Sequence, residues 1–186
     1  MKKLAVITVA LFLAATSNVF AQDDEDAAHN VSINIPEVAL LDLEGGSSIT
    51  LTPDVPTEAG EAFDFSAATD NSIWVNYSSI VASGNSRSVT AAITSGTVPT
   101  GLLLKVAASG YSGTGQGTMG SAGSELTLSG AAQNLVTGIG SCYTGNGANN
   151  GHQLTYQLEL ASASDYDELV QGNTSITVTY TLTEDE

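Results

Sequence analysis

The chain of 186 residues contains one cysteine, two histidines and four basic residues. A single cysteine, Cys142, excludes an intrachain disulfide, so packing has to hold the fold together. The two histidines, His29 and His152, lie in no HExxH or other close metal-ligand spacing. No serine lies in a G-x-S-x-G motif. The sequence therefore predicts a protein that is not an enzyme and that requires no cofactor.

Basic residues are so scarce that negatively charged partners are excluded. Lys2 and Lys3 fall in a predicted signal peptide, which leaves Arg87 and Lys105 against twenty acidic residues and a net charge of −18. Such a charge repels phosphate backbones and anionic membrane surfaces. We therefore expect no nucleic acid and no membrane surface as a partner.

The chain begins like an exported protein. Met1-Lys2-Lys3 precedes an apolar run over residues 4–15, and small residues precede a predicted cleavage site after Ala21. This order is typical of a secretory signal peptide, and the run is shorter than the about 20 residues of a transmembrane helix. No later apolar run has spanning length. We expect a secreted, extracellular or cell-surface protein, with the periplasm as the alternative.

The remaining chain suits one domain, because about 165 residues can enclose one sizeable core. We expect an acidic, disordered leader at residues 22–30, the domain at residues 31–183 and an acidic tail at residues 184–186. Terminal blocks of like charge are usually solvated. Between Asp70 and Glu125 there is no acidic residue at all.

Apolar and polar residues alternate along most of the domain, and this period of two predicts strands. The predicted strands cover residues 31–35, 38–43, 48–52, 73–81, 88–93, 102–107, 125–129, 134–139, 153–160 and 174–182. The glycine-rich stretch Ser109–Gly123 is expected to be a flexible surface loop, and Asp165–Val170 one helical turn. Short strands separated by turns indicate an all-β fold, a single β-sandwich or jelly-roll domain of the Ig-like or pilin-like kind.

Two tyrosines are the candidate ligand contacts. Tyr111 and Tyr143 lie among glycines and serines in predicted loops, where an exposed ring would suit a glycan. Trp74 lies in an apolar strand and is expected in the core. Cys142 is expected to be a small buried hydrophobe. An intermolecular bridge, or a thiol–imidazole pair with His152, is the alternative.

Carboxylates suggest two further possibilities. A calcium site is the more serious one, since extracellular calcium favours oxygen ligands, although no DxDxDG loop occurs. Its candidate ligands are Asp64, Asp70, Asp165, Asp167 and Glu168. Glu125 and Glu159 lie in predicted strands, as a glycosidase pair would, but alternation turns Glu159 toward solvent.

The layout resembles the fimbrial and pilin-like β-sandwich subunits that bacteria export and polymerise. The signal peptide, the domain size, the Ala/Gly/Ser/Thr/Val-rich strands and the terminal strand Ser175–Leu182 carry the resemblance. Chaperone–usher subunits have a glycine and a penultimate aromatic residue in the last strand. Gly172 and Tyr180 are similar, but Thr181–Glu186 follows the aromatic residue, and the usual disulfide is impossible. The resemblance implies a non-enzymatic structural or adhesive subunit.

An N-terminal segment supplies a mechanism for assembly. Val31, Ile33 and Ile35 share one face of the segment His29–Leu43, which would add as a strand to the open sheet edge of a neighbour. The alternative is that this segment is the first strand of its own sandwich. The expected partners are a second copy or another surface protein. A secreted module that binds a glycan or calcium is the competing function.

Overall fold

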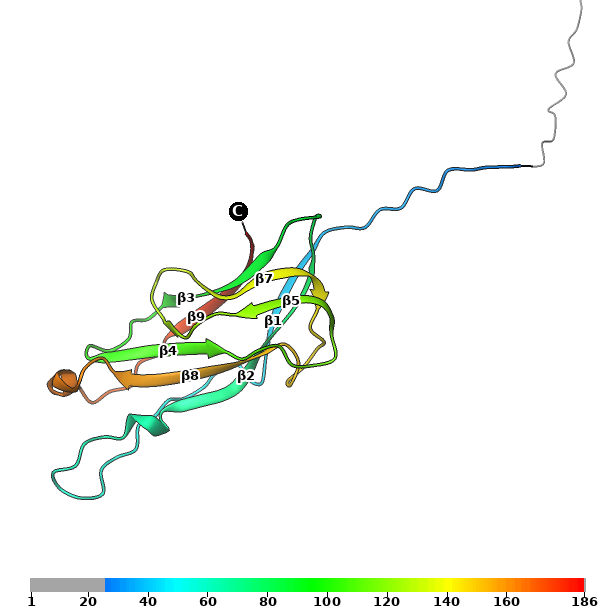
Figure 1. The fold of residues 1–186 in the computed structure, drawn as a ribbon. Coiled ribbons are helices and arrows are strands. Elements are labelled where there is room, and N and C mark those ends of the chain that lie inside the picture. Colours follow the sequence, from blue (N-terminus) through cyan, green and yellow to red (C-terminus); the bar gives the residue numbers. More distant parts are fainter. Residues whose placement is uncertain (1–25, 186) are drawn as a thin grey trace, which may run out of the picture. The chain divides into compact units, whose positions relative to one another are not determined.

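The computed structural model describes residues 26–185, whose regular secondary structure is almost entirely β-strand (Figure 1). The strands are β1 Val38–Glu44, β2 Thr69–Ile80, β3 Arg87–Ser95, β4 Leu102–Ala108, β5 Gln116–Ala122, β6 Leu126–Thr127, β7 Gln133–Tyr143, β8 His152–Leu160 and β9 Thr177–Glu184. Two short 3-10 helices, η1 Phe65–Ala67 and η2 Ala163–Glu168, complete the fold. The predicted all-β class is confirmed. Within residues 26–185, no helix has the length and apolarity of a membrane span.

The strands form antiparallel ladders in two groups that meet at β2. One group runs in the order β6-β4-β8-β2, with β1 on the other edge of β2. The second group contains β5, β7, β3 and β9 in that order. Figure 1 shows β4 and β8 beside β2, and β3 beside β9. Both groups contribute side chains to one core, as in a sandwich.

Strand β2 joins the two groups because it pairs with two strands in succession. Its residues 69–75 pair with β8, and Ser78 and Ser79 pair with the end of β7. After a short turn, β3 continues along β7 with Arg87 opposite Ile139. The chain therefore passes from one group to the other between β2 and β3.

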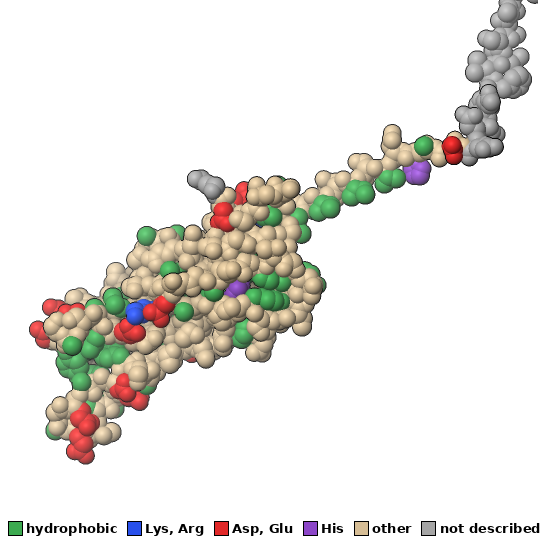
Figure 2. Space-filling view, viewed as in Figure 1, with side chains coloured by type: hydrophobic (Ala, Val, Ile, Leu, Met, Phe, Trp, Pro, Cys, Tyr) green, Lys and Arg blue, Asp and Glu red, His purple; other side chains and the backbone are tan. Residues whose placement is uncertain are grey.

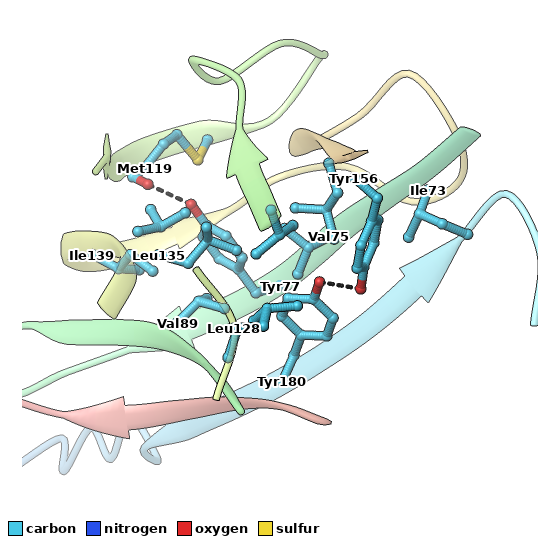
Figure 3. Close-up of a cluster of buried hydrophobic side chains, with 14 of the residues drawn as sticks. Ile73, Val75, Tyr77, Val89, Met119, Leu128, Leu135, Ile139, Tyr156 and Tyr180 are labelled. Atoms are coloured by element: carbon cyan, nitrogen blue, oxygen red, sulfur yellow. Dashed lines mark hydrogen bonds between the residues drawn. The ribbon is translucent and has the colours of Figure 1, made fainter. Parts of the chain in front are cut away.

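The core follows from alternation along the strands, since successive side chains of a strand point to opposite faces. Ile73, Val75 and Tyr77 of β2 are buried among apolar side chains of the second group (Figure 3). Tyr156 of β8 and Tyr180 of β9 place their hydroxyl oxygens 2.5 Å apart. This hydrogen bond links the two groups through the interior.

Three strand expectations are wrong. No strand forms at residues 31–35 or 48–52, although Ile49 and Leu51 still pack partly buried against the core. The expected flexible loop Ser109–Gly123 contains β5. Gly117 shows the reason, because its φ is +107° and a Cβ atom there would lie 2.2 Å from the Ser141 carbonyl oxygen. Glycine is needed there for close approach to β7.

The compact unit that holds all the described strands begins at Ile35. The predicted signal peptide, residues 1–21, and the first leader residues lie outside the described residues, whereas Asp26–Asn30 contains no helix or strand.

Two residues of the predicted acidic tail have structural partners in the domain. Glu184 is the last residue of β9. The Asp185 carboxylate accepts hydrogen bonds from the hydroxyls of Ser86 and Ser88, each at 2.5 Å. Glu186 lies outside the described residues.

Arg87 places a charged group where β1, β2 and β9 meet, and the residue is only 1 % exposed. Its guanidinium has five acceptors: the carbonyls of Val38 and Ile80, the Ser79 hydroxyl, and the carboxylates of Glu37 and Glu184. Four of these belong to or adjoin β1 and β2, and the fifth ends β9. Arg87 therefore ties the first strand of the sheet to the last.

We expect Arg87→Met to lower the free energy of unfolding by about 3 kcal/mol, because it leaves buried acceptors without a donor. Urea unfolding followed by circular dichroism measures the loss. Lys105→Met is the matched control and should cost clearly less, because the ion pairs of Lys105 with Glu125 and Glu159 are exposed to solvent. Equal losses in the two variants would contradict this role of Arg87.

Candidate functional site

The candidate assembly segment presents its apolar side chains to solvent. Val31, Ile33 and Ile35 are 72 %, 82 % and 74 % exposed. Neither a helix nor a strand includes them. Isolated exposed aliphatic residues are common on proteins, but three in alternation form an apolar row. Such a row can pair with an open strand and bury its side chains there.

Tyr111 and Tyr143 occupy different environments. Tyr111 is partly buried against the core, and its hydroxyl donates to the Thr144 carbonyl at 3.1 Å and accepts from the Gly115 N–H at 2.6 Å. Its polar end is therefore used within the protein. Tyr143 ends β7 and is 51 % exposed. Of the two candidates, Tyr143 is the one with the more exposed side chain.

A shallow groove of about 410 Å³ adjoins Tyr143. It lies across the ends of β1, β2, β7 and β5, and apolar atoms dominate its lining. Val38, Ile80 and Tyr143 contribute side chains, and Gly117 and Cys142 also line it. This groove is the described hollow that combines apolar side chains with an exposed aromatic ring.

Cys142 is confirmed as a buried thiol, 6 % exposed. Burial raises its pKa to about 11, so at neutral pH the nucleophilic thiolate is rare. His152 does not pair with it, because both ring nitrogens bind elsewhere: Nε2 lies 2.8 Å from the Tyr77 hydroxyl and Nδ1 lies 2.8 Å from the Ser109 carbonyl. The alternative thiol–imidazole pair is wrong.

His152 is part of a buried polar network that sequence patterns did not reveal. It is fully buried between the rings of Tyr77 and Tyr111. The Tyr77 hydroxyl also donates to the Met119 carbonyl (Figure 3). The Thr144 hydroxyl accepts from the Tyr77 N–H at 3.0 Å. The network joins β2, β5 and β8 with the loop before β5 and the loop after β7.

The protons of this network can be assigned from its acceptors. A carbonyl accepts only, so Nδ1 of a neutral His152 carries the proton that is donated to Ser109. Nε2 is then an acceptor, and it shares the single Tyr77 proton with the Met119 carbonyl. Burial holds the pKa of His152 below its usual value, although the neighbouring carbonyls of Ser109 and Met119 oppose part of that shift. The neutral ring is the state that fits the core.

The candidate calcium ligands are not brought together. Within residues 26–185, no group of three or more His, Cys, Asp or Glu side chains could hold a metal ion. Asp64 accepts from the Ser66 N–H at 2.8 Å and so caps η1, and the hydrogen bonds from Ser66 hold the pKa of Asp64 below its usual value. Asp70 accepts from the N–H and hydroxyl of Ser72.

Two other sequence candidates have structural partners. Glu125 and Glu159 flank Lys105 at 3.2 Å and 2.6 Å, so an ammonium group separates the candidate carboxylate pair.

Trp74 was expected in the core, and this expectation is wrong. Trp74 is half-buried between Glu44 of β1 and Gln153 of β8, on the opposite face of β2 from Ile73 and Val75.

Comparisons with protein families, with curated proteins and with solved structures found no match to this chain.

We expect the free energy of unfolding to depend on pH because of His152. The unfolded chain binds a proton near the ordinary histidine pKa of about 6.5, whereas the folded ring binds one only at lower pH. The stabilisation by the neutral ring is therefore complete above about pH 6.5 and is lost as the pH falls through the lowered pKa. Urea unfolding between pH 7.5 and 4.5 measures this slope.

His152→Gln should make the free energy of unfolding depend less on pH, and His29→Gln should leave this dependence unchanged. A slope that His152→Gln preserves would show that another group titrates in this range.

Proposed function

We propose that this protein is a non-enzymatic structural or adhesive subunit that acts outside the cell and assembles by β-strand addition. The observation that carries the proposal is the exposed apolar row of Val31, Ile33 and Ile35 directly before the first strand of the sheet. Strand addition would bury these side chains and satisfy main-chain groups at the same time. The resemblance to fimbrial subunits points to the same class of function.

The sheet offers edges that suit such an addition. Among the described ladders, β5 pairs with β7 alone and β9 with β3 alone, so each leaves one edge open. Natural sheets commonly protect open edges with charged residues or proline. β1 carries Asp42 and Glu44, whereas β5 has no charged residue and β9 has one only at its last position, Glu184. The chemistry of β5 and β9 therefore favours them as acceptors.

The structural partners of the reactive side chains support the non-enzymatic part of this proposal. Cys142 and His152 are buried and serve packing and internal hydrogen bonds. The carboxylates of Glu125 and Glu159 pair with Lys105. These groups already have partners, and none is presented to a substrate.

We expect Ile33→Asp to weaken self-association of the chain without its predicted signal peptide by about ten-fold, the effect of losing one apolar anchor. Size-exclusion chromatography with light scattering over a concentration series measures it, at about 0.15 M salt to screen the like charges. Ser32→Asp is the matched control, since it adds the same charge to the opposite face of the segment. This control should associate like the wild type.

Deleting residues 22–34 provides a second test that keeps β1 and the Arg87 contacts of Glu37 and Val38 in place. The deleted chain should stay monomeric at concentrations where the wild type assembles. A wild type that is monomeric at every concentration and salt level would refute the proposed assembly.

A further inference from the structure

Apart from Glu184 and Asp185 at the end of β9, the outer face of the group β5-β7-β3-β9 is uncharged, although the protein is strongly acidic. These four strands contain two charged residues, Arg87 and Glu184. Arg87 is buried, and Glu184 is the last residue of β9. Carboxylates gather elsewhere: Figure 2 shows many at the end of the molecule that carries η2 and the loop before η1.

Hydroxyl and amide groups cover this uncharged face. β9 exposes every second residue: Thr177, Thr179, Thr181 and Thr183. The neighbouring strands add Thr90 and Thr94 of β3, Asn134, Thr137 and Ser141 of β7, and Thr118 and Ser121 of β5. The apolar residues between them in the sequence, such as Tyr180 and Ile139, point into the core.

Pairing within the sheet holds these hydroxyls in fixed positions. Thr181 lies opposite Thr90, and the hydroxyls of Thr94 and Thr179 are 2.7 Å apart. The Thr183 hydroxyl donates to the Ser88 carbonyl at 3.3 Å. A hydroxyl that donates within the protein still has lone pairs to accept from a ligand. The face is therefore an ordered array of hydrogen-bonding groups.

Two hollows lie on this face. One, of about 470 Å³, is polar and is lined by Ser88, Asn134, Thr137, Thr183, Glu184 and Asp185. The other is the apolar groove beside Tyr143. Tyr143 and Ser141 are exposed on either side of the buried Cys142, and Thr137 is exposed further along β7. One extended ligand can therefore contact hydroxyls and an aromatic ring together.

We propose that this uncharged face binds a neutral polysaccharide, whose hydroxyls would exchange hydrogen bonds with the threonine array while a sugar ring packs on Tyr143. Anionic polymers are disfavoured by the charge of the whole protein. A second protein is disfavoured because the centre of a stable interface is usually apolar and aromatic, and threonine dominates here. A neutral polyhydroxylated chain matches both the charge and the chemistry of the face.

This inference extends the adhesive role but does not depend on strand addition. The proposed assembly uses main-chain groups at a sheet edge, whereas polysaccharide binding uses side chains on a sheet face. The Ile33→Asp variant should therefore bind the polysaccharide like the wild type, even if it fails to assemble.

Binding to insoluble cellulose and chitin, and affinity electrophoresis in soluble mannan and dextran, test the proposal with the chain that lacks its predicted signal peptide. We expect retention by at least one neutral polymer, no retention by the anionic polymer alginate, and no loss of binding when salt is raised to about 0.5 M, because no ion pair contributes.

The position of the site is tested by two matched charge insertions. Thr137→Glu should weaken binding by about ten-fold, the effect of placing a carboxylate in the contact surface. Thr155→Glu adds the same charge to an exposed position on β8, in the other group, and should bind like the wild type. Tyr143→Ala should also weaken binding. Should Thr137→Glu fail to fold by circular dichroism, Thr137→Ala and Thr179→Ala together are expected to reduce binding several-fold.

Three results would overturn the proposal. The first is that none of the four neutral polymers retains the wild type, and the second is that added salt abolishes retention. The third is that Trp74→Ala abolishes binding while Thr137→Glu leaves it intact, which would place the site on the outer face of β2.

Discussion

The buried guanidinium of Arg87 is the interaction on which the arrangement of the sheet depends. Strand β1 exposes most of its side chains, so apolar burial contributes little to holding it in place. Its ladder with β2 and the contacts of Arg87 with Glu37 and Val38 hold it instead. The same guanidinium reaches Glu184 at the end of β9. A single always-charged group thereby fixes where the chain enters the sheet and where it leaves.

Polar pairs take over the cross-linking role that a disulfide has in many exported domains. The Tyr156–Tyr180 hydrogen bond connects β8 with β9, and the His152 network connects β2 and β8 with β5, with the loop before β5 and with the loop after β7. Each pair lies within the core, where an unmade hydrogen bond is costly. This cost makes other arrangements of the two strand groups unfavourable. Cys142 contributes packing alone, since burial keeps its thiol protonated.

Alternation predicted those strands that carry large side chains. In β8 and β9, Tyr156 and Tyr180 stand in rows of apolar residues that the sequence displays directly. β5 escaped prediction because close approach to β7 requires glycine at Gly117, and glycine is also the residue of loops. Contacts between residues that are distant in the sequence could not be predicted either. Tyr77 and His152 are 75 residues apart, and the role of Arg87 depends on Glu37 and Glu184, which no local pattern joins to it.

The distribution of charge gives the molecule two different kinds of surface. Carboxylates in the loop before η1 and in η2 make one end of the fold strongly repulsive to another copy at low salt. The strands β5, β7, β3 and β9 present main-chain edges and hydroxyls without that repulsion. A copy or a neutral ligand therefore meets the least electrostatic resistance at this group of strands. Their open edges expose unpaired main-chain groups, which suit a β-strand, and their outer face exposes hydroxyls, which suit a polyhydroxylated ligand. Under the two proposals, the protein would join copies of itself along an edge and keep its face free for a polysaccharide surface.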